Sequence, residues 1–101
     1  NLVILPIKTP EAPDSIYPRA EEIIERQLRK ADGVLILCDI FGATPSNIAS
    51  KLIEPNRVEL ITGLNLPMLM RAITYSNQSL DVCVSKALDG GVSGIIHLKG
   101  D

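Results

Sequence analysis

The chain has 101 residues, 46% of them hydrophobic, which suits one globular domain with a single core. Its net charge of −2 argues against a nucleic-acid surface, which needs a basic face. No apolar stretch approaches the length of a membrane span and nothing reads as a signal peptide, so we expect no membrane insertion. The two cysteines, Cys38 and Cys83, lie far apart in apolar segments. This favours buried, reduced thiols and a cytoplasmic location over a disulfide or a metal pair.

The first half of the chain alternates between strand and helix patterns. Residues 2–7 read as a short buried strand, and a proline-rich loop follows over residues 9–13. A helix is predicted to begin between residues 15 and 18, because proline is tolerated in a first turn, and to end at residues 32–33. Residues 34–38 are apolar throughout, which is typical of a strand covered by helices on both faces.

The pattern continues through the middle of the chain. Thr44 is a good N-cap, so a helix is predicted to begin there and to end at residues 54–56. Residues 58–61 form the third predicted strand, and another helix is expected from about residue 66. The positions of that helix expected to face inward are Leu69, Ala72 and Ile73.

The last part of the chain predicts one more helix and one more strand. Ser79 is the expected N-cap of the helix, with Asp81 in its first turn and Lys86 in its last, both matched to the helix dipole. Residues 90–91, two glycines, are expected to turn the chain into a last strand over residues 94–98.

Two polar loops follow predicted strands and mark a candidate site. Alternating strands and helices with short connections predict an α/β protein with a parallel sheet. Ligands of such sheets bind beyond the carboxyl ends of the strands. The loops at residues 39–47 and 62–68 both leave carboxyl ends, so we expect them to meet at one edge of the sheet.

Asp39 and Thr44 are the candidate catalytic residues of the first loop. The Asp39 carboxylate would orient and charge-stabilise a neighbouring imidazole, or else would only cap its own loop. The Thr44 hydroxyl would bind a phosphoryl oxygen, or serve only as an N-cap. Gly42 permits close approach of the backbone, and the N–H groups of a helix N-terminus favour an anion.

The second loop and the one histidine leave alternatives open. Asn65 either points its amide into the site or caps the helix that follows. His97 is the only histidine and lies in the predicted last strand. We interpret it as a residue on a polar strand edge, with a nucleophile or base beside Asp39 as the competing hypothesis. The sequence shows no P-loop, nucleotide fingerprint, nucleophile elbow or metal-ligand cluster, so it predicts no cofactor and no metal.

Residues 39–47 (DIFGATPSN) and 62–68 (TGLNLPM) together resemble the mannose-type (mannose/fructose/sorbose) IIA components of the bacterial sugar phosphotransferase system. The resemblance covers residues 1–101 as one IIA domain. It implies a doubly wound, mostly parallel sheet flanked by helices. It also implies a homodimer in which an antiparallel last strand is exchanged. The implied function is phosphoryl transfer, in which a histidine accepts phosphate from the phosphocarrier protein HPr and passes it to a IIB component.

The resemblance also implies roles for individual residues. Asp39 would hydrogen-bond the phosphorylated imidazole, and Thr44 would help to bind the phosphoryl group. The other residues implied in phosphoryl or partner binding are Phe41, Gly42, Ala43 and Asn65.

One part of the family pattern has no counterpart in these 101 residues. The family's acceptor histidine lies in a loop after a first strand, which in a 2-1-3-4 order would separate residues 2–7 from residues 34–38. Without that strand, each buried unpaired N–H or C=O group would cost about 1–3 kcal/mol. We therefore expect either an N-terminal strand and helix, carrying the histidine, upstream of residue 1, or another chain that fills this gap in the sheet. The open alternatives are a binding module for a partner or an anion, and a phosphotransfer subunit of a dihydroxyacetone kinase.

Overall fold

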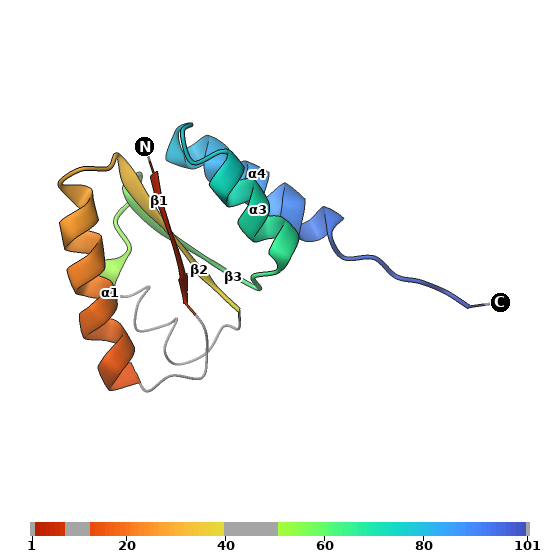
Figure 1. The fold of residues 1–101 in the computed structure, drawn as a ribbon, viewed down its shortest axis with the longest axis horizontal. Helices are drawn as coiled ribbons and strands as arrows, with labels where there is room; N and C mark the ends of the chain where they lie inside the picture. Colours follow the sequence, from red (N-terminus) through yellow and green to blue (C-terminus); the bar gives the residue numbers. More distant parts are fainter. Residues whose placement is uncertain (1, 8–12, 40–50, 101) are drawn as a thin grey trace.

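The computed structural model describes residues 2–7, 13–39 and 51–100, with the backbone alone for residues 13–20. These residues form a sheet of strands with helices packed on it (Figure 1). The described elements are β1 (Leu2–Ile7), α1 (Pro13–Leu28), β2 (Gly33–Cys38), β3 (Val58–Thr62), α3 (Leu66–Thr74) and α4 (Leu80–Ser93). The predicted order of strands and helices is confirmed for these elements, while most of the helix predicted from Thr44 lies outside the described residues.

The described strands form one parallel sheet in the order β1-β2-β3. β1 pairs directly with β2, from Leu2 opposite Gly33 to Ile7 opposite Cys38. The expectation that another strand separates these two is therefore wrong for this structure. The two strands supply six register pairs, so their backbone groups find partners in each other.

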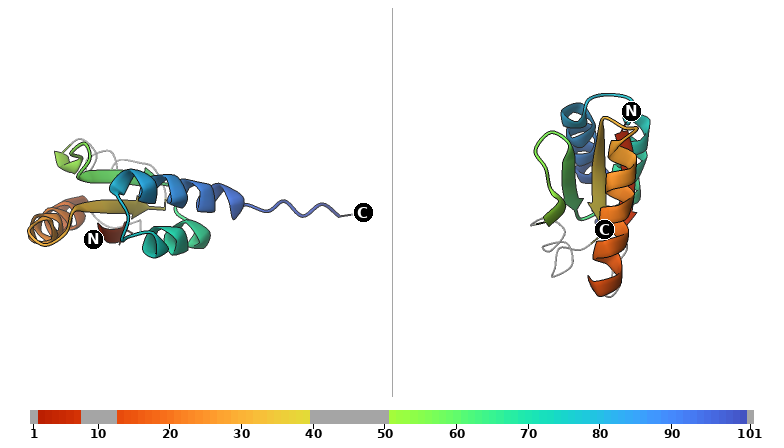
Figure 2. Two further views of the ribbon diagram at one scale, coloured as in Figure 1. Left: turned by 90° about the horizontal axis from the view of Figure 1, so that it is seen from above. Right: turned by 90° about the vertical axis from the view of Figure 1, so that its left-hand side faces the viewer.

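Helices cover both faces of the sheet, as the apolar character of β2 predicts (Figures 1 and 2). Ile24 of α1 lies in one core with Val34 and Ile36, and alternate residues of β2 face the opposite core. That second core joins the sheet to α3 and α4 and contains Leu35, Leu37, Ile61, Met68, Ala72, Leu80, Cys83 and Ala87. Within the described ranges, no helix combines the length and apolar character that a membrane span requires.

Three details of the predictions for α1 and α3 are wrong. α1 begins at Pro13, earlier than expected, because proline fits the first turn of a helix, and it ends at Leu28, before the predicted end at residues 32–33. Ile73 was expected to face inward, but 57% of it is exposed. The buried stripe of α3 runs through Met68 and Ala72, which are four residues apart and so lie on one face of the helix.

The C-terminal part differs most from the sequence prediction. Gly90 and Gly91 lie inside α4 instead of forming a turn, and this places Lys86 in the middle of the helix. A side chain at Gly90 would meet Arg71 and the backbone oxygen of Pro67, so the glycines serve close packing of α4 against α3. Residues 95–100 form no strand in the described chain, and they extend outward from α4 (Figures 1 and 2). The predicted last strand over residues 94–98 is therefore not seen.

Candidate functional site

The ends of β2 and β3 bring the first residues of the two polar loops together. Cys38 and Thr62 are register partners at the carboxyl ends of these strands. The Leu64 N–H donates a hydrogen bond of 3.0 Å to the Cys38 carbonyl oxygen. Asp39 and Gly63, which follow the paired residues, therefore lie at the same edge of the sheet, as the sequence predicted. This edge is at the lower side of the view in Figure 1.

Asp39 is half-buried at this edge. The Cys38 thiol, itself fully buried, lies 3.9 Å from Asp39 Oδ1 as a weak hydrogen-bond donor. A carboxylate in this position directly follows a buried strand and is itself partly exposed. The geometry suits a residue that orients a neighbouring N–H group.

Asn65 connects three parts of the structure through one side chain. Its backbone is extended, and its Oδ1 accepts a 3.0 Å hydrogen bond from the Met68 N–H, which makes it the N-cap of α3. Its Nδ2 donates a 2.9 Å hydrogen bond to the Gly91 carbonyl oxygen of α4. Of the two interpretations of Asn65, capping is the one the structure shows. Its role in phosphoryl or partner binding stays a prediction.

Gly63 gives the second loop its shape. Its φ of +84° lies in the left-handed region, which favours glycine, and a Cβ there would meet nothing within 4 Å. The turn directs Leu64 toward β2 and Asn65 toward α3. The hydrogen bond from the Leu64 N–H to Cys38 was not predicted from the sequence. The signal for it was Gly63, because a glycine directly after a strand indicates a tight turn.

The described residues do not test the placement of the other predicted residues of the first loop. Phe41, Gly42, Ala43 and Thr44 lie outside the described residues, and so does the predicted start of a helix at Thr44. His97 is exposed in the segment that follows α4, so the structure gives no support to its pairing with Asp39. Among the described residues, no group of three His, Cys, Asp or Glu side chains is arranged to hold a metal ion.

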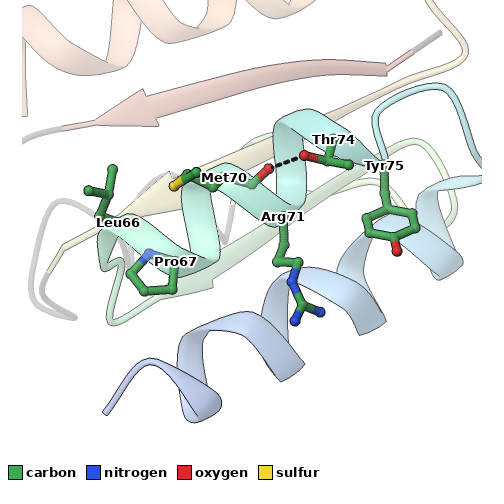
Figure 3. Close-up of a pocket in the computed structure, with 6 residues that line it drawn as sticks. All are labelled: Leu66, Pro67, Met70, Arg71, Thr74 and Tyr75. Atoms are coloured by element: carbon green, nitrogen blue, oxygen red, sulfur yellow. Dashed lines mark hydrogen bonds between the residues drawn. The ribbon is translucent and has the colours of Figure 1, made fainter. Parts of the chain in front are cut away.

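A groove of about 420 Å³ runs along α3, directly after Asn65 (Figure 3). Sequence reasoning did not identify it. The Thr74 hydroxyl donates a 2.8 Å hydrogen bond to the Met70 carbonyl oxygen within it, so the exposed guanidinium of Arg71 is its main polar group. The groove is lined by Leu66, Pro67, Met70, Arg71, Thr74 and Tyr75.

Comparison with known proteins identifies the family. The family model described as "PTS system fructose IIA component" matches residues 1–88. The chain belongs to this family. The resemblance drawn from the two loop motifs is thereby confirmed.

Two curated relatives are bacterial phosphotransferase system proteins. The mannose-specific EIIAB component of Escherichia coli K12 is 37% identical in an alignment of 89 residues that covers 79% of this chain and 28% of that protein. The fructose-specific EIIA component of Bacillus subtilis 168 is 31% identical over 75 residues, which are 73% of this chain and 51% of that protein. The chain thus spans about a quarter to a half of the length of these relatives.

A solved structure supports the fold. The crystal structure of the phosphotransferase system component EIIA from Streptococcus agalactiae matches with a TM-score of 0.69 and 23% identity. The match covers 96% of this chain and 97% of that one. The shared fold is an α/β architecture built on a parallel sheet.

Proposed function

We propose that this IIA-family protein carries a phosphoryl group from HPr to a IIB component, in the cytoplasm, by way of a phosphohistidine. The family membership supports the phosphotransfer class. The observation that carries the proposal is the position of Asp39 at the carboxyl edge, next to the Cys38–Leu64 hydrogen bond that joins the two loops.

Asp39 is the residue that orients the acceptor. An imidazole nitrogen attacks the phosphorus of the HPr phosphohistidine in line, so that one N–P bond forms while the other breaks and the HPr imidazole leaves. The Asp39 carboxylate accepts a hydrogen bond from the other ring N–H of the acceptor, fixing its tautomer and offsetting the positive charge of the ring. Thr44 binds the phosphoryl oxygens together with the backbone N–H groups from Gly42 to Thr44, and Phe41, Gly42 and Ala43 belong to the same phosphoryl- or partner-binding loop.

The acceptor histidine in this proposal is not His97. His97 is the one histidine of the 101 residues, and it lies in the exposed segment after α4. We assign the acceptor to an N-terminal segment of the same protein, beyond the 101 residues, in keeping with the family pattern. This histidine would form its hydrogen bond to Asp39 at the carboxyl edge of the sheet.

The protein also acts as a homodimer in this proposal, with residues 94–98 exchanged as an antiparallel strand. Three large apolar side chains support the exchange, because Ile95, Ile96 and Leu98 are 74%, 70% and 87% exposed in the single chain. An extended apolar segment of this kind is stabilised when it adds to the edge of a sheet.

The experiment is phosphorylation of the full-length protein by phospho-HPr, with Asp39→Asn and Asp39→Ala as variants. We expect transfer to fall roughly 10–100-fold in both, by analogy with the loss of a carboxylate that orients a metal-binding histidine. His97→Gln is the matched control and should transfer at the wild-type rate. Undiminished transfer in the Asp39 variants would remove Asp39 from the mechanism.

A further inference from the structure

We propose that Asn65 is a positioning residue, which fixes the orientation of Asp39 by holding the β3–α3 loop against α4. The inference rests on the proposed function, since Asp39 is the residue that orients the acceptor there. In this inference Asn65 acts indirectly, through the backbone of the loop, and does not contact the phosphoryl group.

The first step is that Asn65 ties the loop at two points with one amide. Its Oδ1 accepts from the Met68 N–H at 3.0 Å, and its Nδ2 donates to the Gly91 carbonyl oxygen at 2.9 Å. Gly91 is 26 residues away along the chain and lies in the buried part of α4. The loop is therefore fixed to two helices at the residue where it ends.

The second step leads from the loop to Asp39. Leu64, the neighbour of Asn65, donates its N–H to the Cys38 carbonyl oxygen at 3.0 Å. That carbonyl belongs to the peptide group that joins Cys38 to Asp39. A loop held by Asn65 thus holds the peptide from which the Asp39 side chain departs.

The third step is that the anchor itself is rigid. Gly90 and Gly91 are buried where α4 packs on α3. A Cβ at Gly90 would lie 2.9 Å from the Pro67 carbonyl oxygen. With no room between the helices, the Gly91 carbonyl oxygen is a fixed point for Asn65.

The test compares Asn65→Ser with Ser79→Ala in the full-length protein. Serine remains a good N-cap for α3 without the amide that reaches Gly91. Ser79 is the N-cap of α4, accepting from the Val82 N–H at 3.3 Å, and it lies at the end of α4 opposite Gly91. Should Asn65→Ser fail to fold, Asn65→Gly replaces it, since glycine is also tolerated at an N-cap.

Two readouts separate positioning from a purely structural role. We expect Asn65→Ser to lower kcat for transfer from phospho-HPr roughly tenfold with KM unchanged, while Ser79→Ala leaves both at wild-type values. Hydrogen exchange of the Leu64 N–H, measured by NMR, should become roughly fivefold faster or more in Asn65→Ser, because the loop loses the stabilisation of about one hydrogen bond. In Ser79→Ala the exchange rate of the Leu64 N–H should stay unchanged.

A double-mutant cycle with Asp39→Asn decides whether Asn65 acts through Asp39. In the Asp39→Asn background, Asn65→Ser should change kcat by less than about twofold. A full tenfold loss in that background would show that Asn65 acts independently, for example on the phosphoryl group. A wild-type kcat in Asn65→Ser would overturn the positioning role alone. No phosphorylation of the wild-type protein would overturn the proposed function, and this inference with it.

Discussion

At the scale of single residues, Cys83 illustrates how burial fixes a protonation state. Its thiol is completely buried on α4 and donates a 3.3 Å hydrogen bond to the Ala72 carbonyl oxygen of α3. Burial raises the pKa of Cys83 above its usual value of 9.0, because the thiolate would lose its hydration. The thiol therefore stays neutral in the folded protein at pH values where the unfolded chain already ionises.

This difference predicts that stability falls in alkaline solution. The folded-state pKa of Cys83 is raised above the unfolded-state pKa of about 9.0. The stability that depends on the neutral thiol is therefore fully present below the unfolded-state pKa, and it is lost as the pH rises through the folded-state pKa. We expect the free energy of unfolding in urea to fall more steeply above about pH 9 for the wild-type protein than for Cys83→Ala. Parallel pH profiles for the two proteins would contradict this account of the buried thiol.

The residues of the site differ in how far the sequence predicts them. Asp39 follows an apolar run, and a polar residue at that place in a parallel sheet is expected at its carboxyl edge. For Asn65 the sequence left capping and ligand contact equally open. Its hydrogen bond to Gly91 joins residues 26 positions apart, so no local pattern predicts it.

At the scale of elements, the contact between α3 and α4 explains why two glycines lie inside a helix. Glycine is unfavourable in a helix interior by about 1 kcal/mol relative to alanine, so a glycine pair read alone predicts a turn. In the structure Gly90 faces Arg71 and the Pro67 backbone, and Gly91 faces Met68. Tertiary contacts override the local propensity here, and sequence patterns do not contain those contacts.

The same contact predicts a larger loss of stability for alanine at Gly90 than at Gly91. A Cβ at Gly90 would meet Arg71 Cγ and lie 2.9 Å from the Pro67 carbonyl oxygen, so the helices must separate. We expect Gly90→Ala to destabilise the protein by about 1–3 kcal/mol in urea unfolding. At Gly91 the near atom is Met68 Cε at 2.8 Å, the mobile end of an adaptable side chain.

Gly91→Ala is the matched control for Gly90→Ala. Because the Met68 methyl group can move away, the helix propensity of alanine should offset the contact, and stability should stay within about 1 kcal/mol of wild type. Equal losses in the two variants would mean that the α3–α4 distance is not set by Gly90.

At the scale of the whole molecule, the sheet and the segment after α4 mark the limits of sequence-based prediction. The alternation of strands and helices predicts a parallel sheet with helices on both faces, and the structure confirms it. The order of the strands in the sheet was not predicted correctly, since β1 pairs directly with β2. Strand order depends on which edges are available, and hydrophobic periodicity carries no information on that.

The exposed segment predicts a change of oligomeric state. Ile96 and Leu98 are two residues apart, so in an extended strand both side chains lie on one face, with His97 on the other. We expect Ile96→Asp with Leu98→Asp to convert a dimer into a monomer in size-exclusion chromatography with light scattering. His97→Asp is the control and should remain dimeric. A wild-type monomer would contradict the exchanged strand.

The most direct test of the central claim is to incubate the full-length protein with phospho-HPr and map the phosphate by mass spectrometry. The account predicts one acid-labile phosphate, on a histidine other than His97, which is lost when a IIB component is added. Phosphate on His97, acid-stable phosphate, or no phosphate at all would contradict the proposal that this IIA-family protein transfers phosphate at the Asp39 edge of the sheet.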